Sequence, residues 1–80
     1  MKKTTRYYGR VALDPQRVNR EIGVIVEEVI ERLTSIPACE VDISIEINAR
    51  LPEGFDEATI RTVSENSRTL KFGHYEFEEE

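Results

Sequence analysis

Residues 40–51 read EVDISIEINARL, and this stretch decides the fold that the sequence predicts. Apolar and polar side chains alternate strictly along it, and four of the apolar residues are β-branched. A period of two with β-branched residues is typical of a strand that buries one face. The opposite face is polar throughout, so it must meet water, another domain or a ligand.

Two shorter stretches show the same alternation. Residues 6–13 place Tyr7 and Leu13 on one side, and residues 73–77 place two aromatic side chains on one side. Because each stretch has one apolar and one polar face, we expect three strands that each bury a single face.

A long helix is predicted between the first two strands. Asp14 can accept hydrogen bonds from free N–H groups of a first helical turn, and Pro15 at the first position sacrifices none. Apolar residues then recur at spacings of three and four, which draws one stripe along about five turns. The stripe consists of Val18, Ile22, Ile25, Val26, Val29, Ile30 and Leu33. Glu28 and Arg32, four residues apart, are expected to pair on the polar face.

A second helix is predicted after a turn at residues 52–54. Asp56 is its candidate N-cap, and Gly73 is the candidate left-handed residue that ends it. Its apolar stripe is thinner and consists of Ala58, Ile60, Val63, Ser67 and Leu70. Gly23, inside the first helix, has two interpretations: a close approach of the sheet, or a glycine tolerated on an exposed face.

The predicted order is strand, helix, strand, helix, strand. One-sided strands place both helices on the same face of a three-stranded sheet, an α+β fold with a two-layer α/β sandwich. The sheet can be parallel or mixed, and the pattern does not decide between them. Residues 1–5 are predicted as a flexible arm or linker, residues 6–77 as a single α/β domain and residues 78–80 as an acidic tail.

The charge distribution argues against a surface that binds polyanions as a whole. The net charge is −5, yet the first twenty residues carry six basic side chains against Asp14 alone. The rest carries five basic and fifteen acidic side chains. A local basic contact to nucleic acid through Arg6, Tyr8, Arg10 and Lys71 therefore stays open as the alternative function.

Several chemistries lack their sequence patterns. No glycine is followed by the lysine of a P-loop, and no glycine-rich dinucleotide fingerprint is present. His74, with Glu76 two residues on, is the single histidine, and a small enzyme centred on it is the least favoured class. Cys39 is the single cysteine, which fits a reducing cytoplasm. We therefore expect a cytoplasmic domain that is not an enzyme and holds no catalytic residue, cofactor or metal, and that does not bind a membrane.

The most distinctive segment is RTVSENSRTLKF, residues 61–72. On a helix, its charged side chains fall along one polar side and offer a docking surface for carboxylates or phosphates. The candidate residues are Arg61, Glu65, Asn66, Arg68 and Lys71. The simpler alternative is an intrahelical pair between Arg61 and Glu65.

The sequence resembles the C-terminal module of large bacterial and archaeal AAA+-like ATPases, a family of unknown function associated with phage-defence and DNA-methyltransferase loci. The resemblance rests on RYYGRVALDP (6–15), VDISIEINA (41–49), RTVSEN (61–66), RTLKF (68–72) and FEEE (77–80). It implies a fragment whose parent protein binds ATP and Mg upstream. It carries no ATPase site residue onto this chain. We therefore expect a non-catalytic accessory domain that docks onto the rest of the parent ATPase or onto a protein partner.

Overall fold

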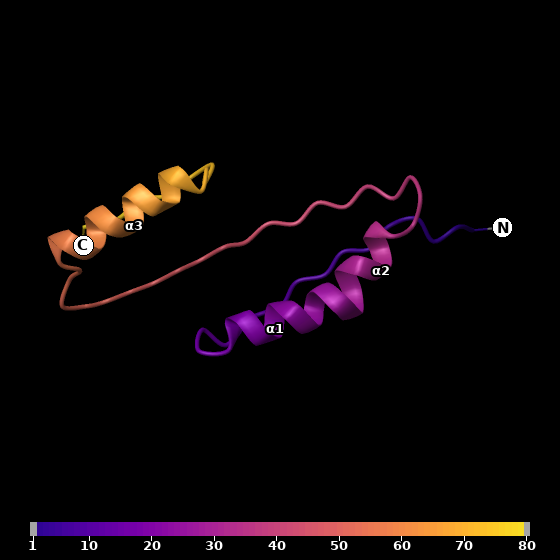
Figure 1. Ribbon diagram of the computed structural model, residues 1–80, viewed down its shortest axis with the longest axis horizontal. Coiled ribbons are helices and arrows are strands. Elements are labelled where there is room, and N and C mark those ends of the chain that lie inside the picture. Colours follow the sequence, from indigo (N-terminus) through magenta and orange to yellow (C-terminus); the bar gives the residue numbers. More distant parts are fainter. Residues whose placement is uncertain (1, 80) are drawn as a thin grey trace. The chain divides into compact units, whose positions relative to one another are not determined.

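The computed structural model describes residues 2–79, so Met1 of the predicted arm and Glu80 of the predicted tail lie outside the described residues. The backbone divides into an amino-terminal unit up to Ser44 and a carboxy-terminal unit from Ile45 onward, and each is described by itself. Regular structure is helical (Figure 1) and consists of α1 (Val18–Ile25), the π-helical segment η1 (Val26–Ile30), α2 (Glu31–Thr34) and α3 (Glu57–Thr69).

The predicted α+β sandwich is wrong, because residues 2–79 contain no β-strand and therefore no sheet. The three stretches expected to be strands are drawn as plain tube in Figure 1. Ile43, Ile45 and Ile47 are 62%, 74% and 69% exposed. Alternation specifies which side chains share a face, whereas a strand is held by backbone hydrogen bonds to a neighbouring strand. Residues 40–51 have the alternating side-chain pattern of a strand, but no neighbouring strand among residues 2–79 forms backbone hydrogen bonds with them.

The apolar face of the first helix was predicted correctly. α1, η1 and α2 follow one another without a break, and all seven residues of the predicted stripe are half-buried. Glu28 and Arg32 form the expected pair at 3.9 Å. In η1 the turn is wider, and the Glu31 N–H donates to the carbonyl of Val26, five residues back. No apolar side chain among residues 2–79 is fully buried, so this stripe keeps an open side.

The start of the first helix differs from the prediction. Helical geometry begins at Val18, and Arg17 at the N-cap position makes no side-chain cap. Asp14 instead accepts a hydrogen bond from the Gln16 N–H at 3.0 Å through Oδ1. Its carbonyl accepts from the Arg17 N–H at 2.9 Å. An aspartate side chain that bonds its own neighbouring backbone stabilises a turn in competition with the helix, which places Pro15 in that turn.

Gly23 is a tolerated glycine and not a point of close approach. A Cβ built on it would meet no atom within 4 Å. We therefore expect Gly23→Ala to stabilise the amino-terminal unit by about 1 kcal/mol, because alanine loses less backbone freedom in a helix. Urea unfolding followed by circular dichroism measures this gain. Gly54→Ala, in the carboxy-terminal unit, should instead destabilise its own unit, since Gly54 has a φ of +92° in the predicted turn. A loss of stability in Gly23→Ala contradicts the open position of this residue.

The N-terminus of α3 confirms Asp56 as its cap. Asp56 has extended backbone geometry, and its Oδ1 accepts a 2.7 Å hydrogen bond from the Thr59 N–H. Hydrogen bonds from the Thr59 side chain and then from its backbone lower the pKa of the Asp56 carboxyl, because both favour the ionised form. The helix start is thus fixed by a local bond that the sequence specifies.

The end of α3 was predicted at the wrong residue. Lys71, and not Gly73, takes the left-handed conformation, with a φ of +64°. The Phe72 N–H donates to the Ser67 carbonyl at 2.9 Å, and the Lys71 N–H donates to the Arg68 carbonyl at 3.0 Å. These two bonds form a Schellman motif, which satisfies carbonyls that the helix end leaves open. Glycine is the commonest residue at this left-handed position, so the Schellman motif forms here although lysine is less favoured in that conformation.

Candidate functional site

The predicted docking surface lies on α3 and on the turn that follows it. Arg61, Glu65 and Arg68 are spaced by four and three residues, so the helix brings them to one side. Asn66 lies next to this row, and Lys71 follows in the Schellman turn. All five side chains are solvent-exposed. The structure therefore presents every predicted docking residue within one helix and its end.

The intrahelical ion pair between Arg61 and Glu65, the simpler alternative to a docking surface, is not formed. Among residues 2–79, the Arg61 guanidinium has no carboxylate within 4.0 Å, and Glu65 is likewise without an ion-pair partner. Elsewhere the same spacing does produce a pair, between Glu28 and Arg32. The guanidinium groups of Arg61 and Arg68 thus keep their donors directed to solvent, where a planar carboxylate or phosphate could accept two bonds at once.

A shallow hollow of about 260 Å³ lies on the same helix. It is lined by Ala58, Thr59, Thr62 and Val63, whose exposed atoms are mostly apolar. Val63 is 45% exposed although it belongs to the predicted apolar stripe. The hollow supplies apolar area beside the charged row, which is the combination that protein contacts use.

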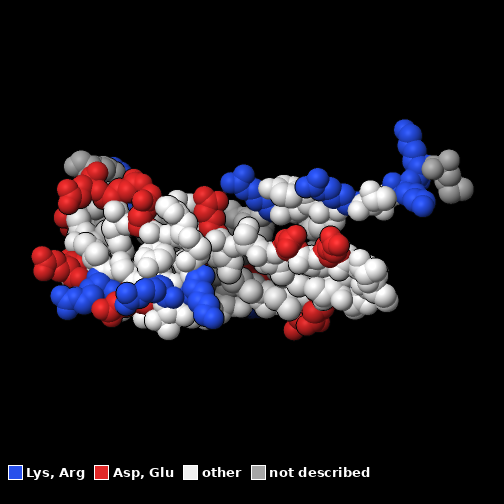
Figure 2. Space-filling view, turned by 90° about the horizontal axis from the view of Figure 1, so that it is seen from above, with Lys and Arg blue, Asp and Glu red and all other residues white. Residues whose placement is uncertain are grey.

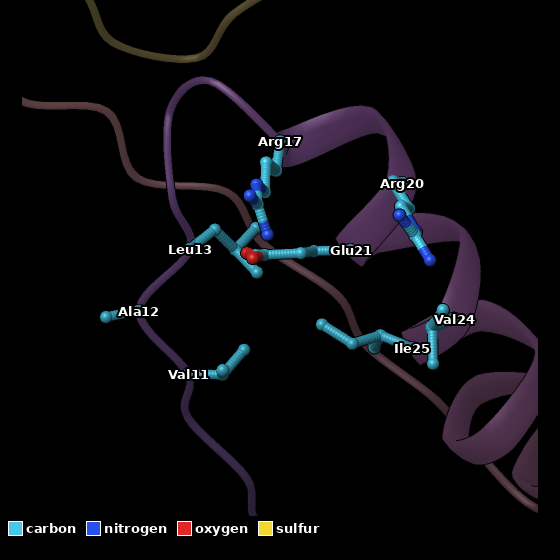
Figure 3. A pocket seen from close by; sticks show the side chains of 8 residues that line it. All are labelled: Val11, Ala12, Leu13, Arg17, Arg20, Glu21, Val24 and Ile25. Carbon is cyan, nitrogen blue, oxygen red and sulfur yellow. The ribbon is translucent and has the colours of Figure 1, made fainter.

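The sequence analysis missed a second surface, a groove in the amino-terminal unit (Figure 3). It has a volume of about 530 Å³ and lies between residues 11–13 and α1. Its lining consists of Val11, Ala12, Leu13, Arg17, Arg20, Glu21, Val24 and Ile25. The signal that could have found it is the pair of arginines at positions 17 and 20, one helical turn apart beside the apolar stripe.

The residues of the alternative nucleic-acid interface are also exposed. Arg6, Tyr8 and Arg10 lie in the amino-terminal unit, and Tyr8 is 75% exposed. Figure 2 shows basic side chains recurring along the extended segment that precedes α1. Tyr7, predicted to face a core, is 62% exposed, and its phenol ring lies over Gly9. Lys71 belongs to the other unit, so the four residues are not one patch within a single unit.

The remaining candidates form isolated features. His74 Nε2 lies 3.5 Å from Glu76 Oε1, and both side chains are largely exposed. Cys39 is a free, exposed thiol. Within residues 2–79, no three His, Cys, Asp or Glu side chains are grouped to hold a metal ion. No helix in this described part is long and apolar enough to cross a membrane.

Comparisons with protein-family models, with curated proteins and with solved structures gave no match. They give no support to an AAA+ ATPase or phage-defence assignment. The α/β sandwich predicted from the alternating pattern is wrong as well, since the regular structure among residues 2–79 is helical only.

Proposed function

We propose that this chain is a non-catalytic accessory domain that docks onto another protein through the polar side of α3. The observation that carries the proposal is the exposed row of Arg61, Glu65 and Arg68, whose charges are not neutralised by an intrahelical pair. A rigid helix fixes the spacing of these groups before binding, so less side-chain order has to be gained on contact.

Two further observations support a protein partner. Apolar surface lies beside the charged row, in the hollow around Val63. Two large apolar side chains at the helix end are exposed as well, Leu70 at 70% and Phe72 at 42%. Apolar area next to unpaired arginines is typical of binding surfaces. The free thiol of Cys39 is compatible with a reducing compartment, and we place the domain in the cytoplasm.

The resemblance noted for the sequence supplies the partner to test first, the ATPase portion of a member of that family. The full chain, labelled with ¹⁵N, is titrated with this portion and followed by NMR. We expect chemical-shift changes centred on Arg61, Asn66 and Arg68. The charge reversal Arg61→Glu with Arg68→Glu should weaken binding about tenfold or more, because the acceptors on the partner lose both guanidinium donors and face carboxylates instead.

The matched control is Lys2→Glu with Lys3→Glu, which changes the net charge equally but lies outside α3. It should bind as the unaltered chain does. Shifts that avoid α3, or equal weakening in both double variants, would overturn the proposal. The alternative class, nucleic-acid binding through Arg6, Tyr8, Arg10 and Lys71, predicts DNA binding that weakens steeply between ~50 and ~200 mM salt.

A further inference from the structure

The groove in the amino-terminal unit has an apolar floor that is open to solvent. In Figure 3 the side chains of Val11, Leu13 and Ile25 point into the space between residues 11–13 and α1, whereas Ala12 points away from it. Leu13 and Ile25 are half-buried, while Val11 is 64% exposed. An aliphatic side chain placed among these three residues would bury apolar surface on several sides.

A hydrogen bond joins the two walls of the groove. The N–H of Asp14, which follows residues 11–13, donates to Glu21 Oε1 of α1 at 2.9 Å. This bond spans seven residues and keeps residues 11–13 alongside the helix. It also gives one oxygen of the Glu21 carboxylate, the only acidic side chain in the lining, a hydrogen-bond donor, while the charge of Glu21 remains.

The rim of the groove carries two cations. Arg17 at the N-cap position of α1 and Arg20 in its first turn line the groove, and neither guanidinium has an ion-pair partner within residues 2–79. The surrounding sequence adds to this field, because Asp14 is the single acidic residue among the first twenty. The groove thus combines aliphatic walls with two donors that match carboxylates.

We propose that this groove binds an acidic segment of a partner protein, with an aliphatic side chain on the apolar floor and carboxylates on Arg17 and Arg20. A nucleic-acid strand fits less well, since the lining has no aromatic ring for bases and the Glu21 carboxylate opposes a continuous run of phosphates. An anionic lipid surface fits less well too, because the helix continues with exposed Glu27, Glu28 and Glu31. The site lies outside α3, so it does not depend on the function proposed above.

The test uses the full chain and a short fluorescein-labelled peptide of alternating leucine and glutamate, followed by fluorescence anisotropy. We expect saturable binding that the double variant Arg17→Gln with Arg20→Gln weakens about tenfold. Arg32→Gln, on the same helical stretch but outside the groove, is the control and should leave the affinity unchanged. A peptide with glutamine in place of glutamate should bind about tenfold more weakly to the unaltered chain.

A second variant separates the groove from general charge. Val11→Asp places a carboxylate at an exposed position of the floor and should abolish binding while the circular dichroism of the helices is retained. Equal binding of the glutamine peptide, or full affinity in the double arginine variant, would overturn the proposal. Three other probes test other occupants: phosphatidylserine vesicles for a lipid, oligo-dT for a nucleic acid and a peptide of residues 73–80 for a second copy of this chain. If one of them binds more tightly than the leucine–glutamate peptide, the proposed acidic protein segment is wrong and that occupant takes its place. Reversal of Arg61 and Arg68 should not change this peptide binding, which distinguishes it from docking through α3.

Discussion

Replacing Ile25 with Asp is expected to lower the free energy of unfolding of the amino-terminal unit by about 2 kcal/mol. Ile25 lies in the centre of the half-buried stripe and points toward residues 11–13 in Figure 3. The substitution removes apolar burial and places a carboxylate against the aliphatic side chains of Val11 and Leu13. In a unit without a fully buried apolar side chain among its described residues, this is a large part of the stability.

Val24→Asp is the matched control for this prediction. Val24 is the preceding residue, is also β-branched and is 52% exposed, so the same change removes little burial. We expect it to cost less than about 1 kcal/mol. Urea unfolding of each variant, followed by far-ultraviolet circular dichroism, measures the difference. Equal destabilisation by the two substitutions would show that the stripe does not pack against residues 11–13.

Replacing Asp56 with Ala is expected to remove much of the helical signal of α3. The helix has thirteen residues, which is near the limit at which an isolated helix is stable in water. Its first turn relies on the Asp56 carboxylate for the Thr59 N–H. Secondary chemical shifts of residues 57–69 give the measurement, since they report the helix residue by residue.

The same cap predicts a pH dependence. The pKa of Asp56 is lowered in the folded chain, so its contribution to stability is complete above the ordinary value near 3.8 and is lost as the pH falls through the lowered pKa. Asp56→Asn keeps an oxygen acceptor without the charge and should hold the helix at neutral pH while removing this acid step. An acid transition of α3 that persists unchanged in Asp56→Asn would contradict the role of the carboxylate.

The parts of the fold that could be predicted are those whose bonds are local. Asp56 caps a turn three residues away, and Glu28 pairs with Arg32 one turn away, so a short window of sequence contains both partners. The stripe from Val18 to Leu33 was correct for the same reason, because helical periodicity needs no distant segment.

The parts that failed depend on choices that a short window does not contain. Residues 40–51 have a strand's side-chain pattern, but a strand also needs a neighbour, and closing the intervening loop costs entropy. At Asp14 two local bonds competed, and the turn displaced the helix start to Val18. At the end of α3 the Schellman bonds selected Lys71 over Gly73. The candidate docking residues on α3 were placed on one side because their helix was predicted, whereas the groove was missed because it depends on how residues 11–13 lie against α1.

The π-helical segment Val26–Ile30 gives the first helix an unusual tolerance in length. Its wider turn contains one residue more than an α-helical turn, since the Glu31 N–H reaches back five residues instead of four. Removing Glu27 or Glu28, both exposed, would leave an ordinary α-helical turn and keep Leu33 on the face that it now shares with Ile22. Removing a residue from α1 would instead rotate everything after it by about 100° and break the stripe. A variant of this chain that lacks one residue at this place should therefore keep the same apolar face.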